Sequence, residues 1–255
     1  MTDHPVLIPA AEGAVGGIVS EPEGGVEAAM LLLGGHGRPA RSGVNSFWAR
    51  TSRRLAREGV LVLRIDYSRE GETLPIGEGK GGLRWKHDLD LSLSAQAAAW
   101  LRERVDDDTP FVFAGVCAGA RLAIELAGRD PRLVAGAFLV VPYLKDLATI
   151  ERRLEAGDAG VDAGTVDPVD PLVVECARRV LLHAPVWALV GERDDSELPE
   201  LQRCLGPNAH RELEVEVVLD AALHLLDQPG LQSEVGDRLV TRIARISTRA
   251  NLRAR

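Results

Sequence analysis

Aromatic side chains are scarce in this sequence. Only 4% of its 255 residues are Phe, Trp or Tyr, whereas 45% of the residues are hydrophobic. The hydrophobic core must therefore consist mainly of Ala, Val, Leu and Ile, which are among the residues most often buried in proteins. A chain of this length accommodates one large α/β domain or two small domains.

Long hydrophobic runs and an excess of positive charge are also missing. No apolar run approaches the ~18–20 residues that span a bilayer, and the N-terminal residues lack the signal-peptide pattern of a basic segment before an apolar one. The 30 Lys and Arg residues are outnumbered by 38 Asp and Glu residues, which gives a net charge of −8. Such a chain lacks the electrostatic footprint of a protein that binds nucleic acid or an anionic membrane. We expect a cytoplasmic protein that binds neither.

Cysteine is rare as well: the chain has three, Cys117, Cys176 and Cys204. They are widely separated, form no CxxC pair and belong to no Cys/His cluster, so the sequence predicts neither a disulfide framework nor a zinc site. The glycine-rich stretch 77–82 invites comparison with a phosphate-binding loop, but no strand precedes it and no Ser or Thr follows Lys80. We expect no metal and no organic cofactor.

Short apolar runs alternate with helical patterns along the chain. Six of these runs are almost continuously apolar, which is typical of parallel strands that helices cover on both faces. Two earlier runs are separated by turn residues and predict an antiparallel hairpin at the sheet edge. The eight predicted strands cover residues 5–10, 14–20, 28–34, 60–66, 111–116, 134–141, 186–191 and 214–220. The alternation predicts one doubly wound, mostly parallel α/β sheet with helices on both faces.

The helical patterns lie between these runs. They predict helices at 45–59, 88–105, 120–128 and about 233–248. The segment 142–183 is too long for a simple connection and contains two more helical patterns joined by a Gly/Asp-rich link. We interpret it as a small helical cap inserted in a single domain that spans residues 1–255.

The stretch "FAGVCAGARL" at 113–122 predicts a turn from a strand into a helix, with Cys117 at the turn. Glycines two residues before and two residues after Cys117 match the spacing of a nucleophile elbow, where a side chain at either position would clash. A helix N-terminus favours a thiolate, and the Ala118 N–H would face a developing oxyanion. A buried packing role is the alternative for Cys117, and we expect that role for Cys176 and Cys204.

Two further reactive residues follow predicted strands. Asp194 lies in "LVGERDD" after the seventh strand, and His224 lies in "LDAALHLL" after the eighth. Ligands bind beyond the carboxyl ends of the strands in open α/β sheets. With Cys117 these residues have the chain order nucleophile, acid, histidine. This order resembles the α/β-hydrolase superfamily, and the resemblance covers nearly the whole chain, including "LLLGGHGRPARSG" in the place of the oxyanion loop.

The resemblance implies a Cys117–His224–Asp194 triad, in which cysteine replaces the usual serine as in dienelactone-hydrolase-like members. Asp195 is the alternative acid. The oxyanion hole would consist of the Ala118 N–H and a second N–H from His36 or Gly37.

The implied activity is acyl transfer or hydrolysis on an ester or a thioester. The substrate is a small acyl compound, either free or bound to a carrier protein, and the cap and residues 68–82 are expected to line its pocket. A thioester intermediate resists water but reacts with amines, thiols and carbon nucleophiles, so cysteine favours thioesterase-like or acyltransferase-like chemistry. Two alternatives stay open. One is an elimination or cyclisation with His224 as base, and the other is an inactive binding module. The sequence predicts no particular oligomeric state.

Overall fold

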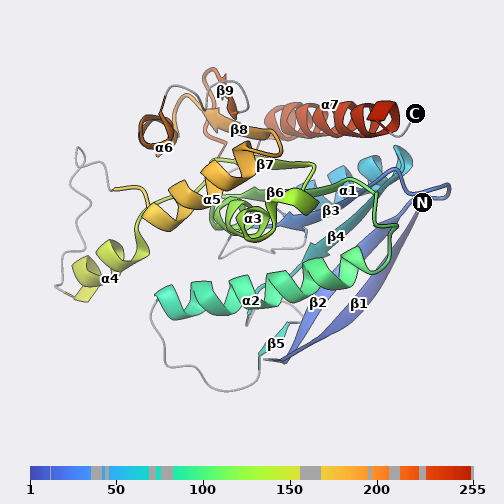
Figure 1. Cartoon of the computed structure of the whole chain (residues 1–255), viewed down its shortest axis with the longest axis horizontal. Helices are drawn as coiled ribbons and strands as arrows, with labels where there is room; N and C mark the ends of the chain where they lie inside the picture. The colour runs from blue at the N-terminus through green and yellow to red at the C-terminus, as the bar shows by residue number, and fades with distance from the viewer. Residues whose placement is uncertain are drawn as a thin grey trace.

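The computed structural model describes residues 1–11, 13–35, 42–43, 46–68, 73–75, 83–155, 168–194, 197–206, 213–223 and 228–253. A twisted central sheet crosses the molecule and helices cover both of its faces (Figure 1). Within the described ranges the sheet has nine strands in the order β1-β2-β4-β3-β6-β7-β8-β9, and β5 pairs with β2. The strands are β1 (Thr2–Ala10), β2 (Gly13–Glu21), β3 (Ala28–Leu33), β4 (Val60–Ile65), β5 (Leu74–Pro75), β6 (Phe111–Val116), β7 (Gly136–Val140), β8 (Val186–Gly191) and β9 (Leu213–Val218).

The strand pairing confirms the predicted architecture. β1 and β2 form an antiparallel hairpin at one edge, and β2 is antiparallel to β4. From β4 through β9 every pair is parallel. All eight predicted strands are present. β5 was not predicted, because two residues are too few to show a strand pattern.

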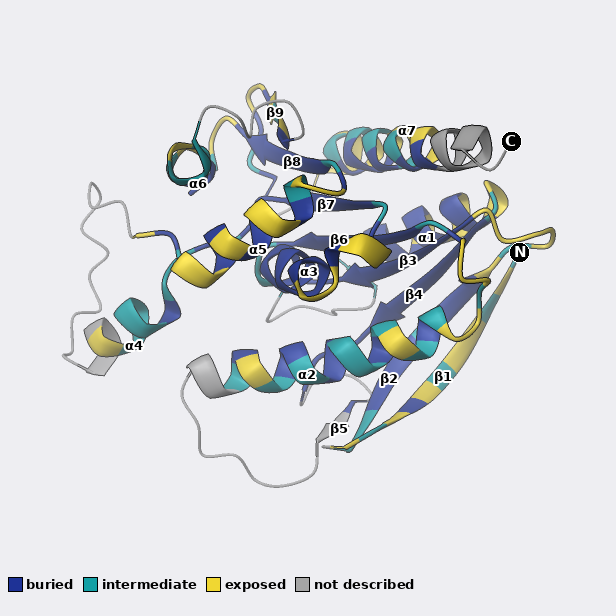
Figure 2. Cartoon of the chain, in the orientation of Figure 1, coloured by how far each residue is buried: buried dark blue, intermediate teal, exposed yellow. Residues whose placement is uncertain are grey.

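Helices divide between the two faces of the sheet. Side chains of α1 (Phe47–Arg57) and α7 (Pro229–Arg253) pack on one face. Those of α2 (Leu83–Arg102), α3 (Ala118–Arg129), α5 (Pro171–Leu181) and α6 (Leu198–Leu205) pack on the other. Buried residues therefore fill the central strands of the sheet, whereas the edge strand β1 is largely exposed (Figure 2). Every residue of β3, β4, β6, β7 and β8 is buried, as the continuous apolar runs predict.

Some helix boundaries differ from the predicted ones. α2 begins at Leu83, before the predicted start at 88, and α7 extends beyond the predicted 233–248 at both ends. α6 was not predicted, since its eight residues give little more than two turns of pattern. A short 3₁₀ turn, Pro131–Leu133, follows α3.

The segment 142–183 contains α4 (Leu147–Glu155) and α5. α4 extends away from the sheet, whereas α5 lies beside α3 (Figure 1). The contact between α5 and α3 is close, because a Cβ at Gly128 would lie 2.6 Å from the Cβ of Cys176. Lys145, before α4, and Val169, before α5, form an antiparallel bridge.

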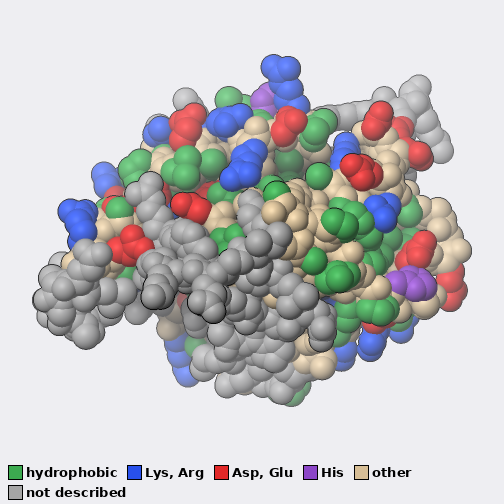
Figure 3. Space-filling view, turned by 90° about the horizontal axis from the view of Figure 1, so that it is seen from below, with side chains coloured by type: hydrophobic (Ala, Val, Ile, Leu, Met, Phe, Trp, Pro, Cys, Tyr) green, Lys and Arg blue, Asp and Glu red, His purple; other side chains and the backbone are tan. Residues whose placement is uncertain are grey.

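The surface of the described residues carries both charged and hydrophobic side chains. On the face seen from below, acidic and basic side chains are interspersed with hydrophobic ones (Figure 3). Among the helices described, none combines the length and the apolar character that crossing a bilayer requires.

Candidate active site

Cys117 lies at the turn between β6 and α3, where the sequence places it. Its backbone has φ 54° and ψ −121°, a conformation that residues with a side chain rarely adopt. Hydrogen bonds hold this conformation from both sides: the Cys117 N–H donates to Val140 O at 2.9 Å, and the Tyr143 N–H donates to Cys117 O at 3.2 Å. Strain of this kind costs about 1–3 kcal/mol and is concentrated at functional sites.

The two glycines beside Cys117 are required by close backbone contacts. A Cβ at Gly115 would lie 2.3 Å from Gly119 O, and a Cβ at Gly119 would lie 2.2 Å from Gly34 O. The second contact brings the end of β3 against the start of α3. The Tyr67 hydroxyl strengthens this junction by donating to the carbonyl of Gly34. The chain that follows Gly34 is the predicted oxyanion loop, so its first residues are anchored next to the turn.

The thiol of Cys117 differs from the expectation that the helix N-terminus would favour its thiolate. Burial raises the pKa of the Cys117 thiol above its usual range. The hydrogen bond with the Ala118 N–H lowers this pKa, and the negative charge of Glu197 raises it further. The pKa is raised overall, because burial destabilises the thiolate more than one hydrogen bond at the helix start stabilises it. The raised pKa favours the neutral thiol over the thiolate.

Asp194 lies in the turn after β8 and contacts the loop after β9. Its Oδ2 accepts hydrogen bonds from the N–H groups of Gly191 and Leu223, both at 2.8 Å. Leu223 immediately precedes His224 in the chain. The Arg193 N–H donates to Ala221 O at 2.9 Å and joins the same two segments. The carboxylate of Asp194 is therefore fixed beside the stretch that leads into the predicted catalytic histidine.

Several predicted site residues lie outside the described residues. They are His36, Gly37, Asp195 and His224. Consequently the distance from Cys117 to His224, the choice between Asp194 and Asp195, and the second oxyanion donor stay predictions.

Glu197 is a site residue that the sequence analysis missed. Its side chain is only 8% exposed, and its Oε1 lies 3.7 Å from Lys145 Nζ. Its Oε2 accepts a hydrogen bond from the Leu144 N–H at 3.3 Å. Tyr143 and Leu144 thus connect the backbone of Cys117 to this buried carboxylate through neighbouring N–H groups. The only sequence signal was position, since Glu197 follows Asp194 by three residues at the same strand end.

The other two cysteines have packing roles, as expected. Cys176 is buried, and burial raises the pKa of its thiol to about 11. Cys204 is half-buried in α6, with its Sγ 3.8 Å from Glu200 Oε1. Among the described residues, no group of three or more His, Cys, Asp or Glu side chains is placed to hold a metal ion.

An apolar recess of about 210 Å³ lies elsewhere in the molecule. Phe111 and Phe113 of β6, Leu126 of α3 and Leu133 are among the residues that line it. Phe111 is the first residue of β6, whereas Cys117 follows the last. The recess is therefore at the opposite end of the strand from the candidate site.

Comparison with known proteins places these features in a familiar fold. No model of a protein family matches the sequence, and no curated protein matches it. Solved structures do match. An alpha-beta serine hydrolase homologue from Coxiella burnetii is 15% identical, with 95% of this chain and 98% of that chain covered and a TM-score of 0.66.

Two further structures show the same likeness. A thermostable carboxyl esterase from Bacillus coagulans is 11% identical over 97% of this chain and 99% of its own, with a TM-score of 0.66. A dienelactone hydrolase from Anabaena variabilis is 18% identical over 94% of this chain and 95% of its own, with a TM-score of 0.62. The strand order, the turn at Cys117 and these likenesses agree, and the chain has the α/β-hydrolase fold.

Proposed function

We propose that this protein is a hydrolase or acyltransferase that uses Cys117 as its nucleophile on a small ester or thioester, either free or attached to a carrier protein. His224 is the general base, and Asp194 orients it. The oxyanion hole consists of the Ala118 N–H and an N–H from His36 or Gly37. The observation that carries the proposal is the strained turn at Cys117, where Gly115 and Gly119 allow a backbone approach that a Cβ would block.

The reaction begins with a neutral thiol. His224 accepts the thiol proton as the sulfur of Cys117 attacks the acyl carbonyl carbon, and the carbonyl π electrons move to the oxygen. The resulting oxyanion accepts hydrogen bonds from the oxyanion hole, in which each donor contributes about 3–4 kcal/mol to lowering the barrier. Asp194 stabilises the imidazolium that forms.

The tetrahedral intermediate then collapses. The bond to the leaving alcohol or thiol breaks, and that group takes the proton from His224. The acyl group stays on Cys117 as a thioester. Water or another acceptor, activated by His224, attacks the thioester and restores the thiol. Deprotonation by His224 within the complex is needed because burial keeps the pKa of Cys117 high.

Three observations support the proposal. The Asp194 carboxylate is bonded to the N–H of the residue before His224. The Ala118 N–H is already directed to the sulfur. Proteins of the same fold include a carboxyl esterase and a dienelactone hydrolase.

The test is trapping of the acyl group. Wild type, Cys117→Ala, Cys117→Ser and Cys176→Ala are mixed with a short acyl thioester, quenched in acid and weighed by intact-mass spectrometry. We expect an adduct on wild type and on Cys176→Ala, and none on Cys117→Ala. Cys117→Ser should show weak turnover at most, since a hydroxyl depends wholly on its base for activation. Thermal melting verifies that each variant is folded.

A second candidate function is elimination or cyclisation, with His224 acting on the substrate directly. The raised pKa of Cys117 favours it, because a neutral thiol can line a pocket without reacting. Full turnover by the folded Cys117→Ala variant would exclude nucleophilic catalysis by Cys117 and leave this alternative standing.

A further inference from the structure

Arg121 is a buried cation that the proposed reaction does not use. It lies in α3, four residues after Cys117, and its side chain is 3% exposed. Its backbone N–H donates to Cys117 O at 3.3 Å, so it is part of the turn that carries the thiol. Burying a guanidinium is costly unless acceptors surround it. The arrangement of its acceptors therefore indicates what the residue does.

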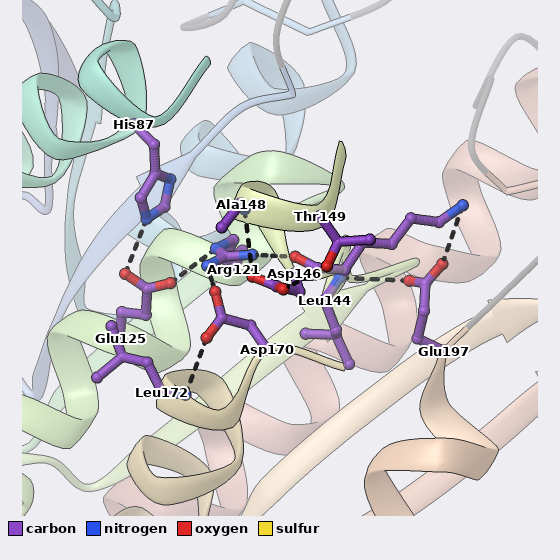
Figure 4. A network of polar contacts seen from close by, with 11 residues as sticks. His87, Arg121, Glu125, Leu144, Asp146, Ala148, Thr149, Asp170, Leu172 and Glu197 are labelled. Atoms are coloured by element: carbon purple, nitrogen blue, oxygen red, sulfur yellow. Dashed lines mark hydrogen bonds and ion pairs between the residues drawn. The ribbon is translucent and has the colours of Figure 1, made fainter. Parts of the chain in front are cut away.

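The guanidinium of Arg121 binds three segments of the chain. Nε donates to Glu125 Oε1 at 2.7 Å within α3. One terminal nitrogen donates to the carbonyl of Lys145 at 2.5 Å, and the other donates to the carboxylate of Asp170. The second oxygen of Glu125 lies 2.8 Å from His87 Nε2 in α2. Figure 4 shows Arg121 at the centre of this network.

Two of these acceptors belong to the segment 142–183, one before α4 and the other at the start of α5. These two parts of the segment are bonded to each other: the Asp170 N–H donates to Leu144 O, and the Asp146 N–H donates to Pro168 O, both at 2.9 Å. Asp170 also begins α5, because its Oδ1 accepts from the Leu172 N–H at 2.9 Å. Arg121 thus binds both parts of the segment to α3, the helix that begins directly after Cys117.

The part of the segment before α4 also contacts the candidate site. The Tyr143 N–H bonds to Cys117 O, the Leu144 N–H bonds to Glu197, and the Lys145 ammonium pairs with Glu197. The Lys145 carbonyl, at the end of the same stretch, accepts from Arg121. The stretch 143–145 is therefore fixed at one end by the turn and at the other by the guanidinium.

We propose that Arg121 is a positioning residue that holds the stretch 143–145 against Cys117 and Glu197 as one wall of the acyl-binding site. The proposal rests on the proposed function, since it takes Cys117 as the residue that receives the acyl group. A guanidinium suits this role because its rigid fork donates to several acceptors at once, which the point charge of a lysine cannot reproduce. Without the guanidinium of Arg121, the stretch 143–145 can move away from Cys117, and the acyl-binding site becomes wider.

The experiment compares how Cys117 reacts with a small and a bulky maleimide, N-methylmaleimide and N-phenylmaleimide. Each rate is measured by peptide mass spectrometry, with Cys204 as the internal reference. In Arg121→Met we expect the bulky-to-small rate ratio at Cys117 to rise about tenfold, since shifts of about 1 Å at a reacting site change rates up to about a hundredfold. The ratio at Cys204 should stay constant.

Three further variants separate positioning from general destabilisation. Arg64→Met removes another buried arginine, one that lies in β4 and is 1% exposed, and it should leave the ratio unchanged. Arg121→Ala should regain the wild-type ratio when guanidinium is added at a concentration that leaves the protein folded. Asp170→Asn removes one charged acceptor and should raise the ratio less than Arg121→Met does. If Arg121→Met does not fold, Asp170→Asn decides the question.

Turnover of acyl esters gives a second readout. With a medium-chain p-nitrophenyl ester, Arg121→Met should raise KM about tenfold and change kcat much less, because the wall contributes to binding rather than to bond making. An unchanged maleimide ratio and an unchanged KM in the folded variants would overturn the proposal. Failure of the proposed function would appear differently, as turnover by Cys117→Ala, and the maleimide ratio does not depend on turnover.

Discussion

At the scale of single residues, the environment of Cys117 combines opposing electrostatic effects. The start of α3 offers the sulfur an N–H from Ala118, whereas burial and the charge of Glu197 act against a thiolate. Burial is the largest of the three influences. The balance therefore favours the neutral thiol, which reacts more slowly than a thiolate.

Changing Glu197 to Gln tests this balance. The substitution removes a negative charge that opposes the thiolate, so the pKa of Cys117 should fall and its alkylation by iodoacetamide at pH 7–8 should become faster by a few-fold. The rate is measured against pH, and the midpoint should move to lower pH. Glu200→Gln, a change at a half-buried glutamate of α6 that pairs with Arg203, is the control and should leave the midpoint in place. A midpoint that rises in Glu197→Gln would contradict the assignment.

Gly119 gives a second residue-scale prediction. In Gly119→Ala the new Cβ would meet the carbonyl oxygens of Gly34 and Leu33 at 2.2 and 2.4 Å. Backbone atoms cannot rotate away, so the variant should lose about 1–3 kcal/mol of unfolding free energy, as overpacked sites do. Chemical denaturation measures the loss.

Gly236→Ala is the matched control for Gly119→Ala. Gly236 lies within α7, and a Cβ there would have its nearest neighbour at 3.5 Å. Replacing a helical glycine by alanine should stabilise the protein by about 0.5–1 kcal/mol. Equal effects of the two substitutions would contradict the argument that the turn requires glycine at 119.

At the scale of elements, hydrogen bonds connect the ends of the neighbouring strands β7 and β8. Val141, directly after β7, has a φ of 42°, which is unusual for a β-branched residue. The Val141 N–H donates to Leu189 O at 2.8 Å, which anchors this strained residue to β8. The chain that follows carries Tyr143 to the carbonyl of Cys117. The path of the segment 142–183 is thus set where β7 ends.

The other tie between elements joins the edge strand β9 to α7. The carboxylate of Glu216 contacts Arg238 and Arg242, and Arg242 also contacts Glu214 at 2.5 Å. Glu216→Gln should cost about 0.5–1 kcal/mol of stability, the upper range for partly exposed ion pairs that form a network. This loss of stability should be smaller in about 1 M salt, where the Debye length is only about 3 Å and the ion pairs are screened.

Denaturant titrations at low and high salt measure the cost of Glu216→Gln. Asp220→Asn serves as the comparison, because its pair with Arg193 is single and both side chains are largely exposed. That variant should change the unfolding free energy by less than Glu216→Gln does. A cost for Glu216→Gln that is insensitive to salt would show that the network does not stabilise α7 electrostatically.

At the scale of the whole molecule, one sheet separates two hydrophobic cores. The core that contains α2, α3 and α5 also supports the turn at Cys117. The core that contains α1 and α7 closes the other face. Because the strands from β4 onward are parallel, their carboxyl ends lie at one edge of the sheet. Residues far apart in the chain, such as Cys117 and Asp194, are thereby directed to the same region.

The sequence alone determined the sheet and the turn. Continuous apolar runs predict buried parallel strands because both faces of such strands are covered. Glycine on either side of Cys117 predicts a sharp turn because the backbone approach there excludes a Cβ. Both signals are local, since neighbouring residues carry them, and the structure confirms both. Two short elements, β5 and α6, gave too little pattern to be predicted.

The tertiary structure alone decided what surrounds the thiol. The pKa of Cys117 depends on how far the folded chain excludes water from the sulfur, and no local pattern records that. Glu197 and two acceptors of Arg121, the Lys145 carbonyl and Asp170, come from segments that are distant from Cys117 in the sequence, so only packing brings them together. A helix start can be predicted from a few residues, whereas desolvation and through-space charge depend on the arrangement of the whole molecule.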